Sequence, residues 1–169
     1  RHPASQEKIL AEIKHAEKES SSLFEFIQAC NYTKQVVEES MRLYPPAYFI
    51  DRVNIEEDEY DGKIVPKGTS LLFSMYEIHR HRDFWEDPEA FKPERFEDTK
   101  RSSAAYYPFG AGPRMCIGNN FAMYEMILAV AELVKKYEMF PPDYTIKIKP
   151  LITLKPDKAI LKFKSRSES

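Results

Sequence analysis

The sequence predicts an α+β fold that is mainly helical, with small antiparallel or mixed sheets and a long ordered meander. Three segments repeat apolar residues at helical spacing, and two regions hold short strand-like runs. Between these regions, residues 77–116 contain four prolines and many aromatic residues, which is typical of a functional loop. At 169 residues and 43% hydrophobic content, the chain is large enough for one domain with a sizeable core.

Two amphipathic helices are expected before residue 47. The first runs from Gln6 to about Lys18, where apolar residues form one stripe among glutamates and lysines. A serine-rich break and an apolar run at residues 23–27 lead into the second, from Tyr32 to Leu43. Two prolines then stop this helix, because proline disfavours helix at its own position and at the residue before it.

Strands are expected on both sides of the meander. Residues 47–76 hold β-branched and aromatic runs separated by turns, so a small sheet is expected there. Residues 116–137 are apolar on more than one face, which predicts a helix that is mostly buried. Alternation over residues 144–149 and 159–164 predicts closing strands.

Charge and cysteine content exclude several classes of function. Lys plus Arg (25) nearly balance Asp plus Glu (27), so no nucleic-acid partner is expected. No apolar run approaches the roughly 18 residues that span a bilayer, so we expect no membrane segment in this chain, while anchoring of a longer parent protein stays open. Cys30 and Cys116 match neither a disulfide framework nor zinc-ligand spacing, which favours a reducing, cytoplasmic location.

The strongest chemical signal is residues 108–118, here called the cysteine loop. Cys116 stands at its end, directly before the third expected helix, whose free N–H groups and positive dipole end favour a thiolate. Arg114 adds a cation suited to an anionic ligand group. The alternative is a small buried hydrophobe, which is the commonest state of a lone cysteine. Three glycines let the backbone approach the sulfur or a flat ligand: Gly110, Gly112 and Gly118.

The full pattern Phe-x-x-Gly-x-Arg-x-Cys-x-Gly occupies residues 109–118. With usages of a few per cent for each fixed residue, chance gives such a match at roughly one in several million starting positions. The pattern resembles the haem-binding signature of the cytochrome P-450 family. Glu39-Ser40-Met41-Arg42 resembles that family's Glu-x-x-Arg motif, and residues 91–96 resemble the proline-arginine motif of its meander.

The resemblance implies that residues 1–169 are the C-terminal, haem-ligating part of a single P-450 domain, without its N-terminal half and long central helix. It implies a haem-thiolate monooxygenase, which inserts one oxygen atom of O2 into a small organic substrate. Haem b is the implied cofactor, and a ferredoxin- or flavin-type reductase is the implied electron donor. This chain alone is expected to be inactive. Two alternatives stay open: a haem-binding chain without oxygenase activity, and a haem-free chain that only folds and self-associates.

The resemblance also implies roles for individual residues. Cys116 is the expected axial ligand of the haem iron, and Phe109 is expected to screen its sulfur and tune the iron's potential. Arg114 and Arg52 are expected to reach haem propionates, and the alternative for Arg52 is an exposed strand residue. The expected cofactor contacts besides Cys116 are Arg52, Phe109, Gly110, Gly112, Arg114, Ile117 and Gly118.

Two further groups of residues follow from the resemblance. Glu39, Arg42 and Arg95 are expected to form a buried structural cluster, whereas an i, i+3 pair is by itself more often a solvated salt bridge. Five residues are expected beside the substrate, with core packing as the alternative: Ala47, Tyr48, Phe49, Leu151 and Ile152. The histidines of residues 79–82 are interpreted as structural, because no carboxylate is spaced as a third metal ligand.

Overall fold

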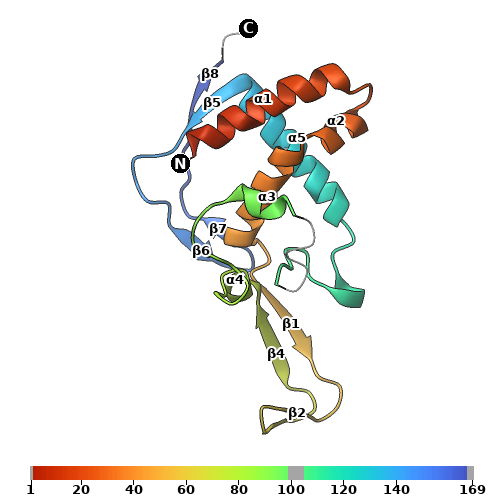
Figure 1. Ribbon diagram of the computed structural model, residues 1–169. Helices are drawn as coiled ribbons and strands as arrows, with labels where there is room; N and C mark the ends of the chain where they lie inside the picture. The colour runs from red at the N-terminus through yellow and green to blue at the C-terminus, as the bar shows by residue number, and fades with distance from the viewer. Residues whose placement is uncertain (1, 99–104, 167–169) are drawn as a thin grey trace.

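The computed structural model describes residues 2–98 and 105–166. These residues form a group of crossing helices with two-stranded ladders at its edges (Figure 1), which confirms the predicted α+β fold class. The described helices are α1 (Pro3–Glu19), α2 (Leu23–Ala29), α3 (Asn31–Leu43), α4 (Met75–Ile78) and α5 (Asn119–Lys136), with 3-10 turns η1 (Pro93–Phe96) and η2 (Gly112–Arg114). None of these helices has the length and apolar content that a bilayer crossing requires.

Residues 23–27 belong to a separate short helix, α2, rather than to a lead into α3. The Ser22 hydroxyl begins α2 by accepting the backbone N–H of Glu25 at 3.2 Å, as an N-cap residue does. The Glu25 carboxylate reaches back to the Ser21 N–H at 2.7 Å. These local caps fix the start of α2, and Cys30 then leaves helical geometry and separates it from α3.

The N-terminus of α3 is capped by a side chain from α1. No side chain at its own N-cap position makes a capping bond. Instead, the Glu12 carboxylate accepts the N–H of Tyr32 at 2.5 Å, the N–H of Thr33 at 2.9 Å and the Thr33 hydroxyl at 2.7 Å. Because the first N–H groups of a helix lack partners within it, this carboxylate both satisfies them and ties α1 to α3.

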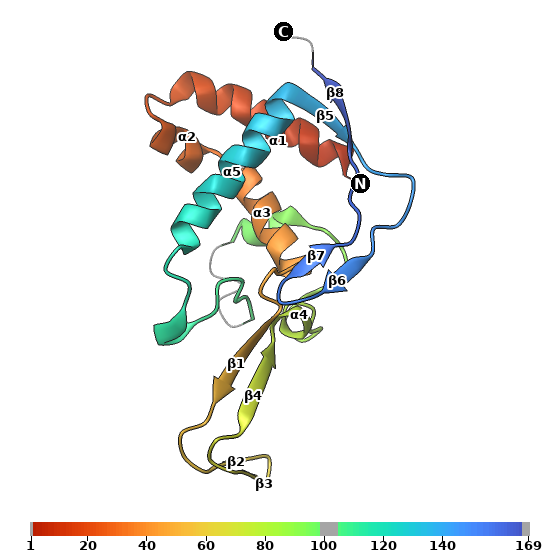
Figure 2. The same cartoon turned by 180° about the vertical axis from the view of Figure 1, so that it is seen from behind.

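The core lies where α1, α3 and α5 cross, as Figures 1 and 2 show from opposite sides. One cluster joins α1 to α5 through Ile9, Ile13, Ala131 and Val134. A second joins α2 and α3 to α5 through Ile27, Cys30, Val37, Met41 and Ile127. The apolar stripe of the first predicted helix therefore faces α5.

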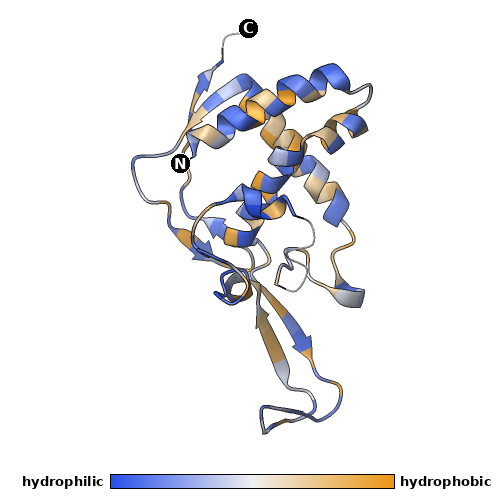
Figure 3. Cartoon of the chain, viewed as in Figure 1, coloured by the Kyte–Doolittle hydropathy of each residue, from blue (hydrophilic) through white to orange (hydrophobic). Residues whose placement is uncertain are grey.

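The expectation that the third helix is mostly buried is wrong for this chain. Only Ile127, Ala131 and Val134 of α5 are fully buried, and Phe121 is 74% exposed. The described residues cover one face of α5, while its apolar side chains occupy more than one face. Figure 3 shows hydrophobic residues both at the helix crossing and along the exposed β1–β4 ladder.

Residues 49–74 form two antiparallel ladders instead of one small sheet. Strand β1 (Phe49–Val53) pairs with β4 (Ser70–Ser74), and Phe49 lies opposite Ser74. Strands β2 (Asp58–Tyr60) and β3 (Lys63–Val65) form a hairpin at the far tip. The whole arm projects away from the helices (Figure 2).

The C-terminal strands differ from the prediction in their bounds. Strand β5 (Tyr137–Phe140) follows α5 directly and pairs with β8 (Lys162–Ser165), while β6 (Ile148–Pro150) pairs with β7 (Leu154–Pro156). The predicted strand over 144–149 is wrong for its first four residues, and the one over 159–164 begins at residue 162. A tertiary contact helps to hold β5: the Gln6 amide donates to Met139 O at 2.8 Å and accepts its N–H at 2.9 Å.

Candidate functional site

The cysteine loop is closed by the backbone of Cys116 itself. The Cys116 N–H donates to the carbonyl of Phe109 at 2.9 Å, and the Met115 N–H donates to Gly112 O at 3.0 Å. Gly110 and Gly112 have φ values of 75° and 68°, a left-handed conformation that side-chain-bearing residues rarely adopt. The two glycines therefore allow the tight path that returns the chain to Phe109.

The Cys116 side chain is exposed at the end of this loop. Helix α5 begins at Asn119, so the prediction that the helix starts at the cysteine is wrong by three residues. The start of α5 still lies against the thiol, because a β-carbon at position 118 would be 3.9 Å from the Cys116 sulfur. The sulfur is thus held between a rigid loop and the start of a helix.

Large apolar side chains close to Cys116 in the sequence are exposed to solvent. Met115 is 51% exposed, Phe121 is 74% exposed and Ile117 is fully exposed. Such exposure is unusual for large apolar residues next to a structured loop, and it marks a surface that binds something apolar. We call Met115, Cys116, Ile117 and Phe121 the cysteine face.

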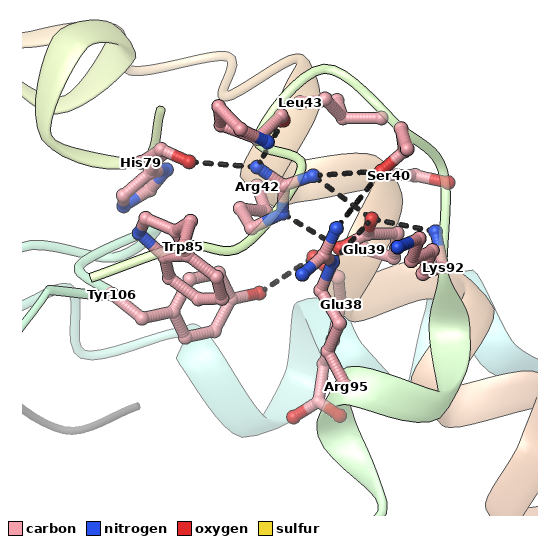
Figure 4. A network of polar contacts seen from close by, with 12 residues as sticks. Glu38, Glu39, Ser40, Arg42, Leu43, His79, Trp85, Lys92, Arg95 and Tyr106 are labelled. Atoms are coloured by element: carbon pink, nitrogen blue, oxygen red, sulfur yellow. Dashed lines mark hydrogen bonds and ion pairs between the residues drawn. The ribbon is translucent and has the colours of Figure 1, made fainter. Parts of the chain in front are cut away.

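A buried ion cluster lies on the C-terminal half of α3 (Figure 4). The Arg42 guanidinium donates to both oxygens of Glu39, at 2.7 Å from Nε and 2.9 Å from Nη2, and both side chains are 0% exposed. Arg95 of η1 donates to Glu39 Oε1 at 3.3 Å, and the Lys92 backbone N–H donates to the same oxygen at 2.8 Å. The structure thus brings Glu39, Arg42 and Arg95 together.

Arg42 also binds three carbonyls of the meander. Its Nη1 donates to His79 O at 2.8 Å and to Pro88 O at 2.7 Å, and its Nη2 donates to Ala90 O at 3.2 Å. The guanidinium carbon lies 5.0 Å from the centre of the Trp85 ring. With all of these partners, the buried charge of Arg42 is compensated and fixes α3 to residues 79–90.

A second set of contacts joins α3 to the segment entering the cysteine loop. The Tyr106 hydroxyl donates to the backbone carbonyl of Glu38 at 3.0 Å, and burial raises the pKa of Tyr106 far above its usual value. The His79 ring, 0% exposed, accepts the Tyr107 N–H on Nε2 at 2.9 Å. Burial lowers the pKa of His79 to about 4, so its ring is neutral at physiological pH. Sequence reasoning gave His79 no specific partner.

Sequence comparison places the chain in a known family. The sequence model of the family described as cytochrome P450 matches residues 1–163. The chain belongs to the cytochrome P450 family. Cytochrome P450 3A18 of Rattus norvegicus is 37% identical over 147 residues, which are 85% of this chain and 30% of that protein. Cyclooctat-9-en-7-ol 5-monooxygenase of Streptomyces melanosporofaciens is 36% identical over 143 residues, which are 83% of this chain and 31% of that protein.

A solved P450 structure shares the fold. The crystal structure of the cytochrome P450DA heme domain matches with a TM-score of 0.88 at 27% identity, over 98% of this chain and 38% of that chain. These findings confirm the resemblance read from the three motifs. The chain spans about a third of the length of the relatives it matches. The solved structure is named as a heme domain, and the Streptomyces relative is named as a monooxygenase.

The two arginines expected at haem propionates lie in different elements. Arg52 is on β1, where its Nη1 donates to the carbonyl of neighbouring Asp51 at 2.7 Å, and Arg114 is exposed in η2. The start of the cysteine loop approaches β1, because a β-carbon at position 110 would lie 3.5 Å from Cδ1 of Ile50. The cysteine loop therefore lies against the strand that carries Arg52.

The residues expected beside a P450 substrate come from two segments that meet. The Tyr48 hydroxyl donates to Leu151 O at 2.8 Å, and the Leu154 N–H donates to Pro46 O at 2.9 Å. Tyr48 and Phe49 pack edge to face, with ring centres 4.8 Å apart. Ile152 is 92% exposed, and Ala47 is exposed as well.

The cysteine face suits a haem by its chemistry. A porphyrin is a large flat apolar ring with anionic propionates and a metal centre that takes an axial thiolate. The exposed sulfur, the apolar side chains around it and the nearby arginine of η2 are the matching groups. Phe109, whose carbonyl closes the loop, is partly buried and packs against the core cluster of α2, α3 and α5.

Proposed function

We propose that this chain is the haem-ligating part of a P450 monooxygenase, with Cys116 as the axial thiolate of haem b. The observation that carries the proposal is the exposed Cys116 sulfur, held by a closed loop and set in an exposed apolar face. The thiol lies just before the start of the 18-residue helix α5. The family match supports the same assignment.

Each surrounding group has a proposed part in holding the cofactor. Ile117 and the glycines of the loop would contact the ring, because an exposed apolar side chain and bare backbone allow a flat group to approach closely. Arg114 and Arg52 pair with the propionates, which suits the geometry of guanidinium and carboxylate groups. Phe109 screens the sulfur from water. When bound, the haem supplies oxygen activation, which a thiolate ligand promotes by donating electron density to the iron.

The buried cluster of Glu39, Arg42 and Arg95 holds the meander in place for this site. It contributes by fixing residues 79–92 to α3, the helix whose Glu38 carbonyl also accepts the Tyr106 hydroxyl ahead of the cysteine loop. The proposed substrate is a small organic molecule lying beside Ala47, Tyr48, Phe49, Leu151 and Ile152. Electrons come from a ferredoxin- or flavin-type reductase.

Titration of haem into the purified chain tests this proposal. We expect one haem per chain and a spectrum of a thiolate-ligated iron. Binding of haem without thiolate character would contradict the role of Cys116 and leave a haem-binding chain. Self-association without any bound haem would indicate instead that the exposed apolar face packs against a second copy.

A test of turnover uses the protein extended to the length of its P450 relatives and supplied with a reductase. The expected result is O2-dependent hydroxylation of an organic substrate that the Cys116→Ala variant lacks. Equal turnover by that variant would refute the assignment.

A further inference from the structure

His79 connects the buried ion cluster with the cysteine loop. It follows α4 directly, and its backbone N–H donates to Met75 O at 3.0 Å. Its carbonyl accepts Arg42 Nη1 at 2.8 Å, and its ring accepts the Tyr107 N–H at 2.9 Å. Figure 4 shows the His79 carbonyl directed at Arg42 and its ring beside Tyr106. His79 thus contacts both Arg42 of the ion cluster and Tyr107 at the entrance to the cysteine loop.

The contact with Tyr107 fixes the tautomer of the ring. Because Nε2 accepts a hydrogen bond, it carries no proton, and the neutral imidazole must carry its proton on Nδ1. Burial, with the charges of Arg42 and Arg80, holds the pKa of the ring at about 4. Among the described residues, Nδ1 makes no hydrogen bond. The hydrogen bond from the Tyr107 N–H to Nε2 therefore orients the ring toward the segment that enters the cysteine loop.

From Tyr107 a short series of backbone bonds reaches the thiol. The Tyr107 carbonyl accepts the Gly110 N–H at 3.1 Å, which shapes the start of the loop. Two residues after Tyr107, the Phe109 carbonyl accepts the Cys116 N–H at 2.9 Å. A shift of Tyr107 consequently moves the carbonyl that holds the ligand cysteine.

We propose that His79 is a positioning residue for Cys116, whose Nδ1–H tautomer couples the Glu39–Arg42 pair to the cysteine loop. This inference rests on the proposed function, in which Cys116 is the axial ligand of the haem iron. The competing explanation is packing alone, because the His79 ring lies 5.2 Å from the Tyr106 ring. The two explanations differ in whether the position of the loop depends on Nε2 as a hydrogen-bond acceptor or only on the presence of a ring.

Two variants separate them. His79→Phe keeps an aromatic ring against Tyr106 and removes the acceptor, while His79→Gln removes the ring and keeps an acceptor at the reach of Nε2. Amide exchange by NMR reports the loop at Tyr107, Gly110 and Cys116, with Ile13 and Val134 of the core as references. We expect His79→Phe to accelerate exchange in the loop about tenfold relative to the references, and His79→Gln to restore it.

Equal acceleration at all sites, or an unchanged loop in His79→Phe, would overturn the proposal in favour of packing. If His79→Phe does not fold, the tautomer of the wild-type ring is measured instead, from the NMR chemical shifts of its two nitrogens. A proton on Nδ1 is the expected result, and a proton on Nε2 would overturn the assignment. These readouts do not depend on haem. Their failure is therefore distinct from a missing thiolate-ligated haem, which refutes the proposed function.

Discussion

Removing the charge of Glu39 should destabilise the protein far more than removing an exposed glutamate. In Glu39→Gln, the 0% exposed Arg42 loses its bidentate carboxylate, whose two bonds measure 2.7 and 2.9 Å, and Arg95 loses its contact at 3.3 Å. Leaving one partner of a buried ion pair uncompensated costs about 3–5 kcal/mol. The carbonyls of His79, Pro88 and Ala90 remain bound to Arg42, so we expect the lower part of this range, about 3 kcal/mol.

The matched control is Glu132→Gln on α5. Glu132 pairs with Lys136 at 2.9 Å within one helix, but both side chains are more than half exposed. Exposed pairs of this kind contribute about 0.3–0.5 kcal/mol. Urea unfolding of both variants, with an unchanged denaturant slope, gives the two free energies. A loss below about 1 kcal/mol in Glu39→Gln would refute the view that this cluster fixes the meander.

Three other perturbations test separate parts of the structure. Since the pKa of His79 is about 4 when folded and about 6.5 when unfolded, the unfolded chain binds more protons between these values. The contribution of His79 to stability is therefore complete above pH 6.5 and falls as the pH drops towards 4. The free energy of unfolding should decrease over this pH range in the wild type, and His79→Gln should lack the part of that decrease that His79 causes. Glu12→Ala removes the cap of α3 and should cost about 1–2 kcal/mol in urea unfolding, against less than about 0.5 kcal/mol for exposed Glu19→Ala. In haem-free protein, mass spectrometry should find Cys116 alkylated well before Cys30, which is 0% exposed and whose pKa burial raises to about 11; equal rates would contradict the structure.

The helices were predictable where one apolar stripe packs on a neighbour. The stripe containing Ile9 and Ile13 in α1 predicted its buried face. The pattern at the end of α5 gave no sign of β5, because Tyr137–Phe140 continues the apolar run and is held as a strand by contacts with Gln6 and β8. Such long-range partners have no local signature in the sequence.

The candidate site was predictable as far as its motifs reach. The Glu-Arg cluster was read from a fixed spacing, and its side chains meet in the structure. The cysteine loop was also read from a fixed spacing, and its backbone closes through the bond from the Cys116 N–H to Phe109 O. The partners that complete them were not predictable: three carbonyls bind Arg42, and His79 binds a backbone N–H. Backbone groups are the same at every residue, so a sequence pattern does not reveal which of them a side chain will bind.

The most direct test of the central claim is the absorbance spectrum of the reduced, haem-loaded protein under carbon monoxide. Wild type, Cys116→Ala and the control Cys30→Ala are compared, because Cys30 is buried in the core whereas Cys116 is exposed. A strongly red-shifted Soret band in wild type and Cys30→Ala, absent from Cys116→Ala, is the result we predict. The same band in Cys116→Ala would contradict ligation of the iron by Cys116.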